Sequence, residues 1–351
     1  MTQALTPVPA APETRRVQVQ PRSFTRRVIS RPELSSLLGV IAVFVLFLAV
    51  APPFRSPASL STVLYSSSTI GIVAVAVALL MIGGEFDLSA GVAVTSSSLT
   101  GSMVAYQFSV NVWVGVVAAL VVSLGIGFLN GYLVVRTKLP SFLITLATFL
   151  MLQGLNLAVT KVVTGNVASD SIADMDGFDS AKEIFAADIP IGGVTVKITV
   201  FWWILFVAVA TWILLRTKAG NWIFAVGGQA ESSRAVGVPV KQTKIGLFMA
   251  VGFLAWFGGM HQLFAFDSVQ SGTGIGQELL FIAAAVIGGC LLTGGYGSAI
   301  GAGIGALIYG ATTQGIVYAG WNPDWVKFFV GATLLIATLL NMWVRLRTSR
   351  R

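Results

Sequence analysis

Ten apolar stretches of about twenty residues constrain this chain more than any other feature of its sequence. A helix of about twenty apolar residues is long enough to cross the hydrocarbon core of a bilayer. The strands of a β-barrel would alternate apolar and polar residues rather than stay apolar for so long. We therefore predict an all-α polytopic membrane protein with about ten transmembrane helices. The expected spans are 34–51, 60–82, 88–107, 112–135, 141–160, 199–215, 245–266, 278–292, 299–318 and 325–344.

The composition excludes a soluble globular domain. Hydrophobic residues make up 55% of the chain and charged residues only 10%, whereas soluble domains carry about 25% charged residues. The 38 glycines suit membrane helices that pack closely through small residues. The chain holds one cysteine, Cys290, so no internal disulfide can form.

The basic residues indicate how the chain is oriented. Seventeen of the 22 Lys and Arg residues lie in four regions that share one side of a ten-span topology. These regions are 1–33, 136–138, 216–244 and 345–351. Cytoplasmic segments of membrane proteins are enriched in Lys and Arg. We therefore predict that both termini are cytoplasmic, and we attribute the net charge of +8 to this bias rather than to nucleic-acid binding.

The same pattern divides the chain into regions. Residues 1–33 are predicted to be a flexible basic cytoplasmic tail, and 348–351 a basic C-terminal end. The transmembrane domain is expected to cover 34–347, with an external loop at 161–198 and a cytoplasmic loop at 217–244. The external loop is acidic, and two interpretations stay open for it: a solvated loop, or a folded cap that contacts an external partner.

The cytoplasmic loop contains a short stretch with the signals of a bounded helix. Gly227-Gly228 is expected to form a turn, and the residues from Gln229 to Val236 about two turns of helix. Glu231 stands in the first turn, with Ser232 and Arg234 following, so both charges complement the helix dipole. Gly237 occupies the position of a left-handed cap, and Pro239 prevents continuation. This helix is either an ordinary loop helix on the membrane surface or the contact point of a cytoplasmic partner.

Two further segments place carboxylates near the spans. The first is MIGGEFDLSAG at 81–91, with Gly84, Glu85, Asp87, Ser89 and Gly91. The second runs from Gly274 to Gly297 and contains Glu278, Gly288 and Gly289. A carboxylate at membrane depth is costly and needs a partner or a function. Asp87 and Glu278 are each interpreted as a helix cap or as part of a transport pathway, and both roles can coexist.

Three motifs together resemble one family. The run E-S-S-R-A-V-G-V is similar to the cytoplasmic coupling segment of bacterial ABC-transporter permeases, most closely the sugar permeases that include ribose and xylose importers. The segment at 81–91 resembles the G-x-D-L-S-x-G signature of that family, with Glu85 in place of the commoner glycine. The region after Gly274 resembles G-x-G-x-E-L-x-x-I-A-A-x-x-I-G-G, with Leu280 in place of an acidic residue. The resemblance covers roughly 60–345.

The resemblance implies the working parts of an importer. The chain would form the translocation pathway for a monosaccharide or similar polyol in the bacterial inner membrane. Its partners would be a second permease copy, a periplasmic substrate-binding protein and an ATP-binding cassette subunit that docks on the cytoplasmic loop. The sequence has no G-x-x-x-x-G-K-[ST] phosphate loop, so ATP and Mg²⁺ are expected on that partner and no cofactor on this chain.

Polar residues inside the spans are candidates for the lining of the pathway. They are Asn130, Gln153, Asn156 and Gln314. Each could instead form a hydrogen bond with a neighbouring helix. His261 stands without the companions that a metal or catalytic site would need, so neither is predicted.

Other functions are compatible with the spans alone. One is a branched-chain amino-acid or nucleoside ABC permease, which would share the architecture. Another is an ion-coupled secondary transporter, which would use Glu85, Asp87, Asp267 or Glu278 as an ion path. A third is a membrane scaffold without solute flux.

Overall fold

The computed structural model describes residues 32–349, with side chains described for 36–339. The predicted basic tail therefore lies almost wholly outside the described residues, as do Arg350 and Arg351. The described elements are α2 (Pro32–Val50), η1 (Pro52–Arg55), α3 (Pro57–Ile82), α4 (Ala90–Gln107), α5 (Val112–Thr137), α6 (Ser141–Thr164), α7 (Phe178–Phe185), β1 (Asp188–Ile191), β2 (Val194–Lys197), α8 (Ile198–Arg216), α9 (Lys218–Ala235), α10 (Val240–Phe266), α11 (Gln277–Ile287), α12 (Ala299–Tyr318) and α13 (Trp325–Ser349).

The helical class predicted from the apolar stretches is confirmed, but the count of ten crossings is not. Within the described residues, six helices are long and apolar enough to cross a membrane: α3, α5, α6, α8, α10 and α12. The expected span 278–292 is the clearest difference, because α11 ends at Ile287 after eleven residues. Such a helix is about 16 Å long, roughly half of the hydrocarbon thickness.

The helices divide into an inner group and an outer group. In the most apolar window of α3, 78% of residues are buried, and the corresponding values are 72% for α10 and 61% for α12. In α6 only 17% are buried, and in α8 only 28%. The exposed residues of these outer helices are large and apolar, such as Leu150 and Leu205. These outer faces suit contact with lipid, whereas α3, α10 and α12 form the centre.

Small residues let the inner helices approach closely. A Cβ atom at Gly127 of α5 would lie 2.5 Å from the carbonyl oxygen of Phe248 in α10, and one at Gly252 would lie 2.5 Å from the carbonyl oxygen of Ser123. Each glycine thus brings α5 and α10 into backbone contact. Close packing through small residues is how membrane helices gain van der Waals energy.

The acidic segment after α6 is folded. It contains α7 and the antiparallel hairpin of β1 and β2, the one departure from the predicted all-helical class among the described residues. Phe185 anchors α7 to α10 through ring contacts with Trp256, Phe257 and Phe264. His261 of α10 hydrogen-bonds to the carbonyl oxygen of Phe185 through Nδ1 at 2.8 Å.

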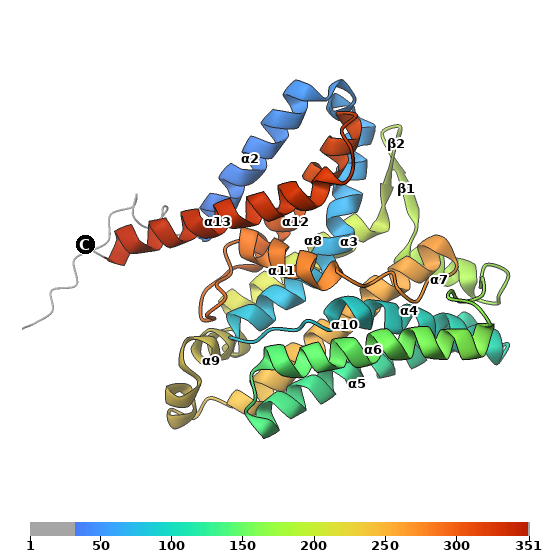
Figure 1. The fold of residues 1–351 in the computed structure, drawn as a ribbon, viewed down its shortest axis with the longest axis horizontal. Helices are drawn as coiled ribbons and strands as arrows, with labels where there is room; N and C mark the ends of the chain where they lie inside the picture. The colour runs from blue at the N-terminus through green and yellow to red at the C-terminus, as the bar shows by residue number, and fades with distance from the viewer. Residues whose placement is uncertain (1–31, 350–351) are drawn as a thin grey trace, which may run out of the picture.

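Figure 1 shows how α10 connects the two ends of the molecule. The olive helix α9 lies at the lower left, where α10 begins, and α7 lies at the right, where α10 ends. A helix of 27 residues is about 40 Å long. One straight element therefore runs from the loop with the short helix to the folded acidic segment.

Candidate functional site

The predicted short helix is the second part of α9. The first part continues through Gly227-Gly228, so the turn expected there is wrong in position. The break falls at Gln229, whose φ of −159° and ψ of 94° are not helical. Ser233 holds the two parts together, because its buried hydroxyl lies 2.8 Å from the carbonyl oxygens of both Ala225 and Gln229.

The short helix ends as its sequence predicts. Gly237 has a φ of +87°, in the left-handed region that glycine favours. The amide of Gly237 donates to Arg234 O at 3.1 Å, and that of Val238 donates to Ser233 O at 3.0 Å. These bonds satisfy the last carbonyls of the helix.

The surface of this helix is open to a partner. Glu231, Ser232, Arg234 and Gly237 are all exposed. Beside them Val236 exposes 81% of its surface. A polar rim around an apolar side chain is compatible with a protein-binding surface.

Three glycines join α9 to the ends of two spans. Gly84 follows α3, and Gly294 lies between α11 and α12; both have positive φ values. A Cβ atom at Gly294 would lie 2.6 Å from Gly84 Cα and 2.7 Å from Gly227 O. A Cβ atom at Gly227 would collide with Ile82 O. We call Gly84, Gly227 and Gly294 the glycine junction. It places the sequence motif 81–91, the loop 217–244 (here called the coupling loop, after the resemblance described above) and the turn after α11 in backbone contact.

Residues 83–89 form a non-helical stretch between α3 and α4, here called the broken segment. Its largely buried backbone amides need partners, because a buried amide without one costs about as much as a lost hydrogen bond. Side chains of α6 supply two of them: Ser141 Oγ accepts from Phe86 N at 3.0 Å, and Thr145 Oγ1 accepts from Leu88 N at 3.1 Å. Ser141 and Thr145 are one helical turn apart and buried. Helix α6 therefore supplies hydrogen-bond acceptors to two successive points of the broken segment.

Asp87 and Asn130 belong to one buried hydrogen-bond network. Ser89 donates to Asp87 Oδ1 through its amide at 2.8 Å and its hydroxyl at 2.6 Å. Asn130 of α5 donates to Ser89 Oγ at 2.9 Å and accepts from Thr148 Oγ1 of α6 at 2.7 Å. Helix α4 starts at Ala90 with Ser89 in the N-cap position, so Asp87 is not the cap itself. Asp87 instead stabilises Ser89, the N-cap residue, by accepting its two hydrogen bonds.

Glu85 does not face open space. Its side chain is 9% exposed and forms an ion pair with Lys244 of α10. This is one of two ion pairs among the residues that the structure describes, and the other, Lys197 with Asp188, lies on the exposed hairpin. The departure from the sugar-permease signature at Glu85 is therefore matched by a cation from the coupling-loop side of the chain.

Glu278 caps the short helix α11. Both of its carboxylate oxygens lie 3.1 Å from the amide of Gly276, and its side chain is buried. Gly91 at the start of α4 packs against it, since a Cβ atom there would lie 2.9 Å from Glu278 N. Gly288 and Gly289 end α11, and a Cβ atom at Gly288 would collide with Gly301 of α12.

The four polar residues proposed for the pathway fall into two groups. Asn130 and Asn156 are buried and fully engaged; Asn156 accepts from Ser96 Oγ at 2.9 Å and donates to Val92 O at 3.2 Å. Gln153 and Gln314 are partly exposed, and neither side chain has a hydrogen bond to another described residue. The two asparagines thus position α4, whereas the two glutamines make no such bond to another described helix.

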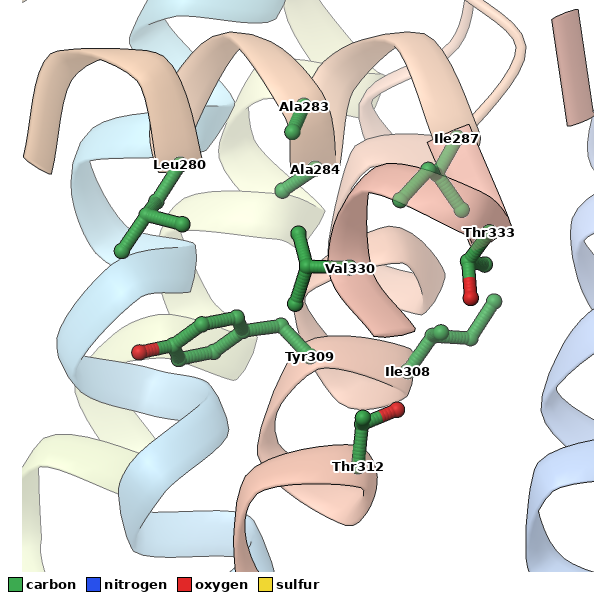
Figure 2. A pocket seen from close by; sticks show the side chains of 9 residues that line it. All are labelled: Leu280, Ala283, Ala284, Ile287, Ile308, Tyr309, Thr312, Val330 and Thr333. Carbon is green, nitrogen blue, oxygen red and sulfur yellow. The ribbon is translucent and has the colours of Figure 1, made fainter. Parts of the chain in front are cut away.

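A mainly apolar pocket lies where α11, α12 and α13 meet (Figure 2). Six of its nine lining side chains are aliphatic, and none of the residues proposed for the solute pathway is among them. The lining residues are Leu280, Ala283, Ala284, Ile287, Ile308, Tyr309, Thr312, Val330 and Thr333. The lining side chains leave no room in it for even a water molecule, so it is not a solute site.

Several residues of the site were not predicted, and all of them except Ser233 lie outside the three motifs. Ser141, Thr145 and Thr148 recur at spacings of four and three along one face of an apolar span, which is the pattern that could have identified them. Ser233 and Lys244 have no comparable local pattern. Lys244 meets Glu85 across 159 positions of the chain, and only the fold brings them together.

Comparison with known proteins agrees with the three motifs. The model of the family described as "Branched-chain amino acid transport system / permease component" matches residues 59–338. The ribose import permease protein RbsC of Escherichia coli (strain K12) is 30% identical over 312 residues, 88% of this chain and 93% of the relative.

Two other sugar permeases match to a similar extent. The galactose/methyl galactoside import permease protein MglC of the same strain is 30% identical over 320 residues, 86% of this chain and 93% of the relative. The fructose import permease protein FrcC of Rhizobium meliloti is 28% identical over 316 residues, 90% of this chain and 85% of the relative. No solved structure matches. With a model match over most of its length, this chain belongs to the family of branched-chain amino acid transport system permease components.

Proposed function

We propose that this chain is the membrane subunit of an ATP-driven importer and forms the pathway for a monosaccharide or similar polyol. The observation that carries this proposal is the exposed, capped helix at the end of α9. The glycine junction joins α9 to the broken segment after α3 and to the turn between α11 and α12. Such a helix lets a cytoplasmic partner act on the spans without entering the bilayer. The inner membrane is the corresponding location.

The relatives favour a sugar over a branched-chain amino acid or a nucleoside. Three of them, named as import permeases for ribose, fructose and galactose, align with 86% to 90% of this chain. Three of the four carboxylates named for the ion-coupled alternative are already engaged, since Glu85 is paired with Lys244 and Glu278 caps α11. Asp87 is likewise engaged by Ser89.

We assign one partner protein to each end of the molecule. An ATP-binding cassette subunit would carry ATP and Mg²⁺ and contact Glu231, Arg234 and Val236. A periplasmic substrate-binding protein would contact the opposite end, where α7 and the hairpin form a folded cap. A second copy of the permease would complete the pathway within the lipid bilayer.

Ten crossings with both termini in the cytoplasm remain the topology that we propose. The six long apolar helices would be joined by α2, α4, α11 and α13, with α11 extended by the residues that follow it. The distribution of Lys and Arg supports this orientation. In Figure 1 α13 ends on the left, the side on which α9 also lies.

ATP-dependent uptake by variants of the short helix tests this function. Arg234→Glu reverses an exposed charge at the proposed contact, so it should abolish uptake of radiolabelled ribose, fructose and galactose in cells while membrane insertion is unchanged. Lys241→Glu, an exposed charge reversal just beyond the loop helix, is the matched control and should transport normally. Normal uptake by a correctly inserted Arg234→Glu variant would refute the coupling role.

A further inference from the structure

The broken segment lies between two parts of the chain that flank the short helix: the first part of α9 and the start of α10. On one side Gly84 meets Gly227 of the first part of α9, and a Cβ atom at Gly84 would lie 3.3 Å from Gly227 Cα. On the other side Glu85 is paired with Lys244 in the second turn of α10. The short helix 230–235 connects these two parts. Any displacement of that helix is therefore applied to the broken segment from both sides.

The ion pair is the stronger of the two attachments. The Glu85 side chain is 9% exposed, and the Lys244 side chain is 20% exposed. Separating two largely buried charges leaves each of them unpaired in a medium that solvates ions poorly. The Gly84 contact, in contrast, is only van der Waals packing and can slide. When α10 moves, Glu85 should move with Lys244.

The far end of the broken segment leads to the polar interior. Phe86 and Leu88 are held by Ser141 and Thr145 of α6, and Asp87 is held by Ser89. Ser89 starts α4, and through Asn130 it is connected to α5. A shift of Glu85 thus changes the position of the start of α4 relative to α6.

We infer, on the basis of the importer function proposed above, that Glu85 and Lys244 are positioning residues that transmit movement of the coupling helix to the broken segment. Neither contacts the sugar. The pair carries the displacement because its two charges stay together, and the broken segment converts it into a change at the start of α4.

Reconstitution separates this role from a merely structural one. The wild-type permease, its ATP-binding subunit and its substrate-binding protein are placed in proteoliposomes, and uptake of radiolabelled ribose, fructose and galactose is measured together with ATP hydrolysis. Glu85→Gln and Lys244→Met should each lower the sugar taken up per ATP by about tenfold or more, within the usual range of coupling between sites. ATP hydrolysis should persist.

Two further variants complete the test. The double exchange Glu85→Lys/Lys244→Glu restores an ion pair and should recover the ratio to within about threefold of wild type. Lys241→Met removes an exposed charge from α10, three residues before Lys244, and should leave the ratio unchanged. A variant that merely folds badly loses uptake and hydrolysis together, and comparing equal amounts of monodisperse protein identifies it.

The outcomes distinguish the inference from the function on which it rests. If the wild type shows no ATP-dependent uptake of any of the three sugars, the proposed function fails. If the wild type transports and the single variants keep its uptake-to-ATP ratio, the positioning role of Glu85 and Lys244 is overturned. The same holds if the exchanged pair is no better than either single variant, or if uptake and hydrolysis fall in parallel.

Discussion

Replacing Asn130 with alanine tests whether the buried network at the start of α4 stabilises the bundle. Asn130 is fully buried and forms two hydrogen bonds, one to Ser89 at the end of the broken segment and one from Thr148 of α6. Interhelical hydrogen bonds in membrane proteins contribute about 0.6 kcal/mol each on average. Both former partners keep another bond, because Ser89 still donates to Asp87 and Thr148 can still donate to Ile144 O.

The expected loss for Asn130→Ala is therefore moderate. Two bonds amount to about 1.2 kcal/mol, and the small cavity raises the total to about 2 kcal/mol. Reversible unfolding in bicelles measures this difference. Gln153→Ala is the matched control, since Gln153 is a partly exposed amide on α6 with no hydrogen bond to another described residue; it should cost less than about 0.5 kcal/mol.

Two results would contradict this reasoning. A loss below about 0.5 kcal/mol for Asn130→Ala would mean that the network contributes nothing to stability. A loss above about 4 kcal/mol would mean that Ser89 and Asp87 are left unpaired when the amide is removed, so that the three side chains act as one unit.

The remaining predictions concern the coupling loop. Gly227→Ala places a Cβ atom against Ile82 O at the glycine junction and should destabilise the protein by about 1 to 3 kcal/mol, whereas Gly228→Ala, with open space around it, should have little effect; thermal unfolding in detergent compares them. Ser233→Ala removes the hydroxyl between the two parts of α9 and should increase proteolysis near Gln229, with Ser232→Ala as the control, and equal cleavage of both would refute this anchoring role.

The sequence predicted which segments form helices, but it did not always predict how long each helix is. Hydropathy identifies α3, α5, α6, α8, α10 and α12, because an uninterrupted apolar run of such length has no other stable form in a membrane. The same reasoning failed for α11. The apolar run continues past Gly288-Gly289, and hydropathy does not register that Gly289 adopts a φ of +93° and ends the helix.

The candidate site was only partly visible in the sequence. The cap at Gly237 depends on neighbouring residues and was predicted correctly, because glycine after a helix has a direct conformational meaning. The turn at Gly227-Gly228 was misplaced, because the helix continues through both glycines and Gly227 packs closely against Ile82 and Gly295. Tertiary contact determined their role.

The roles of the polar residues inside the spans also depend on tertiary contacts that the sequence does not reveal. The sequence indicated that Asn130 and Gln153 could line a pathway or bond a neighbouring helix, and it offered no means of choosing. The choice depends on which side chains of other helices face each amide. Asn130 meets Ser89 and Thr148, while Gln153 lies on the partly exposed side of α6.

Co-purification from native membranes tests the central claim most directly. The tagged chain is solubilised under mild conditions, and the proteins that accompany it are identified for the natural loop and for Glu231→Lys/Arg234→Glu. We predict that an ATP-binding cassette subunit accompanies the natural loop and is lost with the double variant. Recovery of the permease without any ATPase, or equal recovery of the ATPase with both loops, would contradict the account.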